Sequence, residues 1–115
     1  MEKKNKNPYK NFMEAFGDDY IMRISIEELS ELIKAICKYK RKCEDVDTEE
    51  KELRYKILDG IADVEICIEE LAYMFDGFDE INKIKYEKIE KGTERALKYK
   101  EKNNDISRIY HRKCD

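Results

Sequence analysis

The stretch DGIADVEICIEEL, residues 59–71, combines the apolar pattern of a buried helix with two residues that such a helix seldom holds. Its Ile, Val, Ala, Cys and Leu residues predict a helix that packs against other elements. Gly60 costs a helix about 1 kcal/mol relative to alanine. The carboxylate of Asp63 is costly in an inward position unless another group pairs with it. The partner of Asp63 is therefore the first question that the sequence raises.

Length and composition predict one all-α domain. The chain has 115 residues, of which 44% are charged and 41% hydrophobic, with one proline and four glycines. So few turn residues argue against a sheet, and the apolar residues recur with a helical period. We expect a single domain over residues 1–115, with a core at about 18–102 and a C-terminal tail at 103–115.

No apolar run approaches the roughly 18 residues that a membrane span needs, and the N-terminus lacks the apolar segment of a secretory signal. We therefore expect a cytoplasmic protein with no membrane partner.

Four helices are predicted, near residues 9–16, 19–42, 48–75 and 79–102, arranged like a four-helix bundle. Gly17 ends the first. The second is expected to begin at Asp18 or Asp19 rather than at the capping-box residue Ser25, because its apolar stripe already runs upstream of Ser25. That stripe comprises Met22, Ile26, Leu29, Ile33 and Ile36.

The third helix is apolar on two sides. At about 100° per residue its core stripe comprises Ile57, Leu58, Ile61, Val64, Ile68, Leu71, Ala72 and Phe75. The opposite, partly apolar side holds Gly60, Asp63, Ile66, Cys67, Glu70 and Met74. A helix of this kind lies in the interior of a bundle or at a subunit interface.

Three carboxylates are candidates for one site. Glu28 and Glu31 are three residues apart, beside the stripe of the second helix, and they converge with Asp63 if the second and third helices pack antiparallel. Converging carboxylates repel one another unless a hard divalent cation such as Mg²⁺ neutralises them. The alternative is that Asp63 pairs with a lysine of a neighbouring helix and that the two glutamates are ordinary solvated residues.

Charge is distributed unevenly along a chain whose net charge is −3. Residues 44–80 carry three Lys/Arg against fourteen Asp/Glu, whereas residues 81–115 carry eleven against six. This pattern indicates either solvated helix faces or a site in which acidic residues hold a cation and basic residues meet an anion.

The segments IEELSELIKAICKYKR, IADVEICIEELAYMF and YEKIEKGTERAL together resemble the MazG-like all-α nucleoside-triphosphate pyrophosphohydrolases, a superfamily that also includes dimeric dUTPases. The family motif E-E-x-x-E matches at Glu27, Glu28 and Glu31. In the second motif, E-x-x-D, Asp63 matches but Gly60 replaces the glutamate. The basic cluster of the family matches at Lys88, Lys91 and Arg95.

The resemblance implies hydrolysis of a nucleoside or deoxynucleoside triphosphate to the monophosphate and pyrophosphate, as a hydrolase of nucleotide metabolism. It implies Mg²⁺, with Mn²⁺ as the alternative ion, held by Glu28, Glu31 and Asp63. Glu27 and Asp59 are the auxiliary acids that could compensate for Gly60. Lys88, Lys91 and Arg95 would bind phosphate, and the chain would form a homodimer or homotetramer.

The sequence also supports one alternative function. Because Gly60 replaces an acidic ligand, the chain could be a catalytically degenerate relative that binds nucleotides or other proteins. Nucleic-acid binding through the basic fourth helix is not expected, because the net charge is negative and the tyrosines there do not form a stacking platform.

Overall fold

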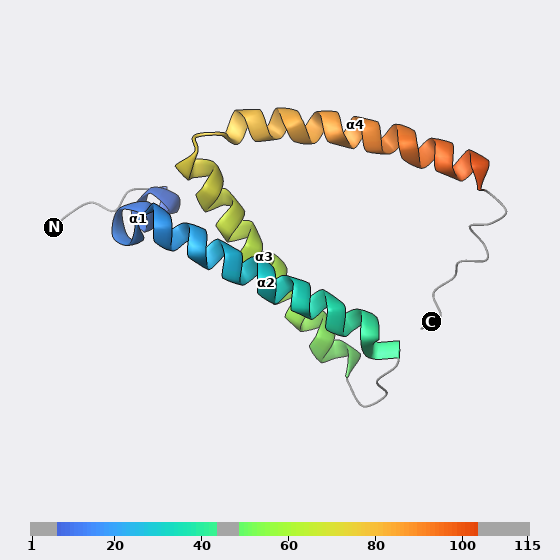
Figure 1. Ribbon diagram of the computed structural model, residues 1–115, viewed down its shortest axis with the longest axis horizontal. Helices are drawn as coiled ribbons and strands as arrows, with labels where there is room; N and C mark the ends of the chain where they lie inside the picture. Colours follow the sequence, from blue (N-terminus) through green and yellow to red (C-terminus); the bar gives the residue numbers. More distant parts are fainter. Residues whose placement is uncertain (1–6, 44–48, 104–115) are drawn as a thin grey trace. The chain divides into compact units, whose positions relative to one another are not determined.

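The computed structural model describes residues 7–43 and 49–103, and within these ranges the chain is all-α, as predicted. The elements, shown in Figure 1, are α1 (Pro8–Phe16), α2 (Asp18–Lys40), the short 3₁₀ helix η1 (Arg41–Cys43), α3 (Glu50–Met74) and α4 (Phe78–Lys102). The ends of the four predicted helices were placed to within two residues. The chain divides into two compact units, Met1–Gly77 and Phe78–Asp115, which we describe separately.

Gly17 connects α1 to α2 through a backbone conformation that favours glycine. Its φ is 81°, a value at which a side chain would be strained, and its N–H donates to the carbonyl of Met13 at 2.9 Å. The rings of Phe16 and Tyr20 stack across this corner with their centroids 4.9 Å apart. Gly17 thus ends α1 and starts α2, and the early start predicted for the second helix is confirmed.

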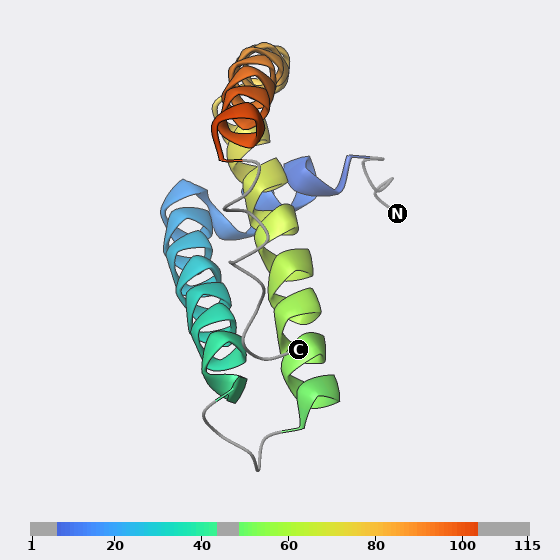
Figure 2. The ribbon, with the colours of Figure 1, turned by 90° about the vertical axis from the view of Figure 1, so that its right-hand side faces the viewer.

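Helices α2 and α3 pack side by side and antiparallel, as Figures 1 and 2 show. The most buried side chains of the described residues lie on these two helices: Ile21, Ser25, Leu53, Val64, Cys67 and Ala72. The hydroxyl of Ser25 donates to the carbonyl of Ile21 at 2.7 Å, so this buried polar group is satisfied within its own helix.

Gly60 lies at a close contact between α3 and α2. A Cβ atom placed on it would lie 3.1 Å from Cδ1 and 3.5 Å from Cα of Leu32. Gly60 is buried, whereas Ala62, two residues further along α3, is exposed. The conformational cost of this glycine is therefore offset by the close helix packing that it permits.

The apolar stripe predicted for the second helix is not covered within one chain, and the core stripe predicted for the third helix is covered only in part. All five stripe residues of α2 are exposed, with exposed fractions between 40% and 66%. On α3, Val64 and Ala72 of the predicted stripe are buried, but Leu58, Ile61, Ile68 and Phe75 are exposed. The side of α3 that meets α2 is the one carrying Gly60 and Cys67. Small residues on that side allow the two backbones to approach more closely than the more apolar sides would.

Both ends of α3 are held by local interactions. At its start, Glu50 accepts a hydrogen bond from Tyr39 Oη at 3.1 Å and pairs with Lys42 Nζ at 3.1 Å, which connects it to the end of α2 and to η1. At its end, Asp76 has a φ of 50° and the Gly77 N–H donates to the carbonyl of Ala72 at 3.0 Å, a Schellman-type termination. Asp47, whose residue type also suits a helix cap, lies outside the described residues, and Glu49 stands at the cap position without a side-chain hydrogen bond.

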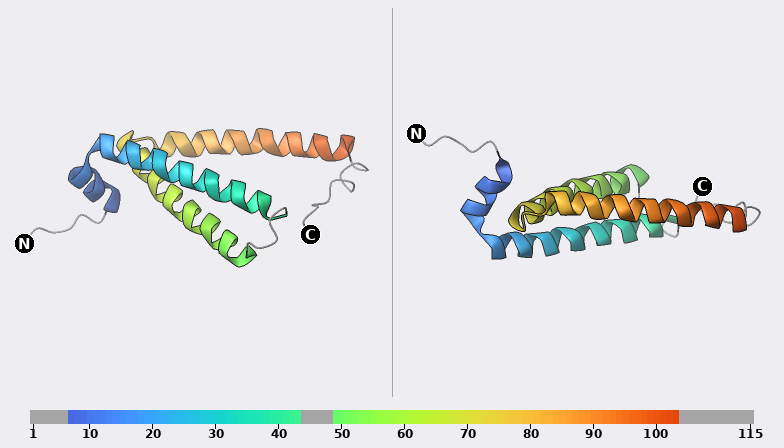
Figure 3. Two further views of the ribbon diagram at one scale, coloured as in Figure 1. Left: turned by 60° about the horizontal axis from the view of Figure 1, so that its bottom comes forward. Right: turned by 90° about the horizontal axis from the view of Figure 1, so that it is seen from above.

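The second unit contains α4, which Figure 3 shows as one continuous helix despite Gly92. Asp79 and Glu80 lie in its first turn and Lys100 and Lys102 in its last, which complements the helix dipole. Within the described ranges, no helix has the length and apolar character needed to cross a membrane.

We predict that Gly60→Val destabilises the protein by about 1 to 3 kcal/mol, because the added carbons must displace Leu32 or separate the two helices. Ala62→Val is the matched control. It introduces the same residue on the same helix at an exposed position, so it should cost only the difference in helix propensity, about 0.6 kcal/mol. Urea unfolding followed by circular dichroism measures both values, and equal losses would contradict the packing role of Gly60.

Candidate functional site

A cleft of about 650 Å³ lies between α2 and α3. Because the two helices are antiparallel, residues near the middle of α2 face residues near the middle of α3. Five carboxylates line the cleft: Glu28, Glu31, Glu52, Asp59 and Asp63. The three candidate metal ligands predicted from the sequence therefore share one cleft, and its volume lies in the range of small-molecule binding sites.

Glu28 and Asp63 form the centre of the acidic group, and both are half-buried. Burial raises the pKa of Glu28 above its ordinary value, and the charge of Asp63 and a hydrogen bond between the two side chains raise it further. The charges of Glu31 and Glu27 act in the same direction. The pair is thus two acidic groups that interact across the helix interface and disfavour full ionisation.

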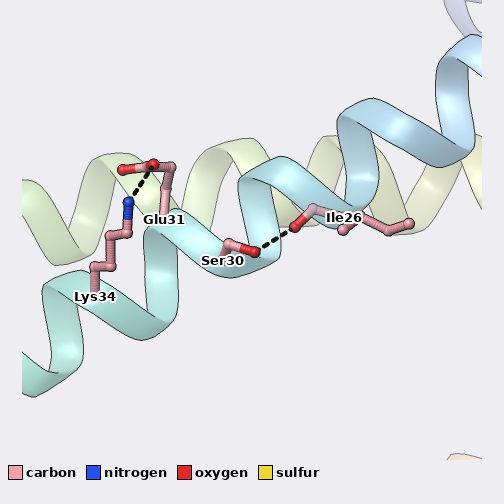
Figure 4. Close-up of polar contacts among 4 residues, drawn as sticks. All are labelled: Ile26, Ser30, Glu31 and Lys34. Atoms are coloured by element: carbon pink, nitrogen blue, oxygen red, sulfur yellow. Dashed lines mark hydrogen bonds and ion pairs between the residues drawn. The ribbon is translucent and has the colours of Figure 1, made fainter.

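Glu31 lines the same cleft, but its carboxylate is engaged with a neighbour on its own helix. Its Oε1 lies 3.3 Å from Nζ of Lys34, one turn further along α2 (Figure 4). The side chains are 63% and 68% exposed, and an exposed ion pair of this spacing contributes about 0.5 kcal/mol or less. Moving Glu31 away from Lys34 towards a ligand in the cleft therefore costs little.

The two auxiliary acids differ in position. Asp59 lines the cleft next to Gly60, so a carboxylate is available beside the position where the resemblance expects a glutamate. Glu27 is exposed and does not line the cleft, although its charge contributes to the raised pKa of Glu28. Of the two, Asp59 is the better placed to act on a ligand in the cleft.

Among the residues that the structure describes, no three His, Cys, Asp or Glu side chains are arranged to hold one metal ion together. Mg²⁺, however, is commonly bound through one or two carboxylates, with substrate phosphates and water completing its coordination. The interacting pair of Glu28 and Asp63 meets this smaller requirement. The donor set therefore fits an ion that binds together with a phosphate ligand.

Basic side chains that the sequence analysis did not select also line the cleft: Lys34, Lys38, Arg41 and Lys56. The sequence does contain a signal for three of them. Counted from Glu31, Lys34, Lys38 and Arg41 lie 3, 7 and 10 residues further on, the spacing of one helix face. A basic last turn also complements the helix dipole, so this signal alone does not assign the residues to a ligand site.

The basic residues predicted to bind phosphate, Lys88, Lys91 and Arg95, lie exposed on α4 in the second unit. Their role stays a prediction.

Comparison with known proteins identifies no relative of this chain. No protein-family model, no curated protein and no solved structure matches the chain.

We predict that Glu28 makes the protein less stable as the pH rises. Below about pH 4 its carboxyl is protonated in both the folded and unfolded states. As the pH rises, the unfolded state ionises first because the folded pKa is raised, so the free energy of unfolding falls through this window. In EDTA, the unfolding free energy of the wild type relative to Glu28→Gln should therefore decrease between about pH 4 and pH 7.

Urea unfolding of both proteins across this range measures the effect. In an Asp63→Asn background the pH-dependent difference should shrink, because the main charged partner of Glu28 is lost. A difference that stays constant with pH would show that Glu28 is not perturbed by folding.

Proposed function

We propose that this chain is a MazG-like, divalent-cation-dependent hydrolase that converts a nucleoside triphosphate or deoxynucleoside triphosphate to the monophosphate and pyrophosphate. The observation that carries the proposal is the pair Glu28 and Asp63, two half-buried acids from different helices that interact within a cleft of nucleotide-compatible size. Two packed helices do not need such a pair for stability, because two interacting acids raise the free energy of the folded protein at neutral pH. A bound cation removes that penalty.

Each acidic residue has a distinct part in the proposed reaction. Glu28 and Asp63 would hold Mg²⁺ or Mn²⁺ through their carboxylate oxygens, and Glu31 would leave Lys34 to add a further oxygen. Such an ion would supply charge neutralisation at the phosphate and would lower the pKa of the attacking water. Asp59 would orient that water by accepting a hydrogen bond from it.

The second candidate is a non-catalytic relative that binds a nucleotide or another protein. Two observations favour it: Gly60 offers no carboxylate, and Glu31 is paired with Lys34 rather than directed at Asp63. Both candidates bind a ligand in the same cleft, so turnover rather than binding separates them.

We expect the purified chain, incubated with Mg²⁺ and a panel of ribonucleoside and deoxyribonucleoside triphosphates, to release pyrophosphate from at least one of them. Asp63→Asn should lower kcat/KM by about a hundredfold or more, because it removes one of the two central carboxylates. Glu65→Gln, an exposed change on the same helix outside the cleft, should stay within about twofold of the wild type. Release of pyrophosphate from none of the nucleotides would refute the hydrolase and leave the non-catalytic candidate.

We also propose that a second copy of the chain covers the exposed stripe of α2, giving the dimer that the resemblance implies. The stripe is nearly symmetric about Leu29, with Ile26 three residues before it and Ile33 four residues after it. Met22 and Ile36 lie seven residues on either side of it, and Asp18 and Lys40 lie eleven residues on either side. Two antiparallel copies of α2 would therefore place apolar residues against apolar residues and Asp18 of each copy against Lys40 of the partner. The exposed apolar residues of α3 offer a further surface, which a tetramer would use.

We predict that Leu29→Glu dissociates this dimer, because the symmetry brings the two introduced carboxylates close together at the centre of the interface. Light scattering coupled to size-exclusion chromatography measures the mass, and circular dichroism confirms that the helices persist. Ile66→Glu, a similar change at an exposed position of α3, is the control and should leave the dimer intact. A wild-type monomer at all concentrations would contradict the assembly.

The register has its own test. Asp18→Lys and Lys40→Asp should each weaken the dimer, and the double variant should restore it, because the swapped charges again face each other.

A further inference from the structure

The basic residues of the α2–α3 cleft are separated in space from its central acids. Along α2, Glu28 and Glu31 come first, followed by Lys34 and Lys38, and the basic group ends at Arg41 in η1. Lys56, nearer the start of α3, lies at the same end because the helices are antiparallel, and so does Glu52. One cleft therefore has an acidic half around Glu28 and Asp63 and a half around Lys38 in which basic side chains outnumber the single Glu52.

We propose that the basic half, formed by Lys34, Lys38, Arg41 and Lys56, binds a linear polyphosphate chain. This inference deepens the proposed function and rests on it for the identity of the ligand: the chain is the terminal phosphates of the nucleotide, which leave as pyrophosphate. The acidic half holds the cation beside the phosphate that is attacked.

The distances along the helix suit such a ligand. At 1.5 Å per residue, Glu28 is about 9 Å from Lys34 and about 15 Å from Lys38 along the axis of α2. Flexible lysine and arginine side chains shorten these spans at the basic end. A phosphate chain that starts near Glu28 and Asp63 therefore meets Lys34 first, and the longer side chains of the basic half reach towards its far end within the same cleft.

Of the four cations of the basic half, one, Lys34, is paired with Glu31 at 3.3 Å. Within the described part of the chain, Lys38, Arg41 and Lys56 form no ion pair, whereas the neighbouring Lys42 is held by Glu50 at 3.1 Å and lies 4.7 Å from the centre of the Tyr39 ring. Glu52 and Asp59 also line the cleft and reduce its positive potential without neutralising these three groups. Unpaired cations that share a concave surface are a general arrangement for binding phosphate, and the planar guanidinium of Arg41 suits bidentate contacts.

The two halves together set the direction in which the chain binds. Without a cation, the acidic half repels phosphate, so only the basic half accepts it. This arrangement differs from the basic cluster predicted on α4, which belongs to the other unit. The two locations can therefore be separated by substitution.

Inorganic triphosphate in EDTA is the probe, titrated into the full-length protein by isothermal calorimetry at low ionic strength. We expect binding that Lys38→Glu and Lys56→Glu each weaken by about tenfold or more. Arg54→Glu is the matched control, since it changes the net charge equally on an exposed residue of α3 that does not line the cleft, and it should stay within about twofold. Circular dichroism verifies that each variant is folded.

Three results would overturn the inference: no binding of triphosphate, an equal loss in Arg54→Glu, or a loss in Lys91→Glu with no loss in Lys38→Glu and Lys56→Glu. The outcome is distinct from that of the hydrolase test. Triphosphate binding with the expected dependence, but no turnover of any nucleotide, supports the basic half and refutes the hydrolase. Turnover with a KM unchanged in Lys38→Glu supports the hydrolase and overturns the role of the basic half.

Discussion

The close approach of α2 and α3 at Gly60 is the contact on which the rest of the first unit depends. Leu32 packs where a side chain at position 60 would otherwise lie, and this brings the two helix backbones together. The same approach places Asp63, one turn further along α3, beside Glu28. Compared with the motif of the family that the sequence resembles, glycine at this position removes one carboxylate. It also sets the helix separation that allows the two remaining central acids to interact.

The positions of the helices could be predicted from the sequence, but not the faces on which they pack. Helix ends depend on local signals such as Gly17 and the acidic first turns, and these act within a few residues. The face that each helix turns towards its neighbour depends on which two helix surfaces are complementary in shape. Periodicity favoured the most apolar face of α2, whereas the structure packs the face bearing Ser25 and Leu32 against the small residues of α3. A helix with two usable faces does not reveal, from one sequence, which of them its own chain covers.

In the candidate site, too, some features could be predicted from the sequence and others could not. The predicted antiparallel packing of the second and third helices is necessary for Glu28 to meet Asp63, but the meeting also depends on the faces that pack, which the structure supplies. The ion pair of Glu31 with Lys34 depends on rotamers, which residue spacing leaves undetermined. The basic residues near the end of α2 do not by themselves predict a binding site, because the helix dipole alone explains a basic last turn. Their shared cleft with Lys56 becomes visible only when α3 is in place.

Electrostatics couples the two halves of this cleft. The raised pKa of Glu28 means that ionising the acidic half costs free energy in the absence of a cation, and the repulsion extends to any phosphate that approaches it. Under the proposed function, a divalent ion would lower both costs at once, so the ion and a phosphate chain would each favour the binding of the other. The basic half would hold the far end of the chain and would not need the ion. The proposal therefore implies that a ligand with several phosphates binds more tightly than one with a single phosphate, since only the longer anion would reach both halves. Selection for the length of the phosphate chain would then follow from the order of charges along one helix, independently of which base or sugar the nucleotide carries.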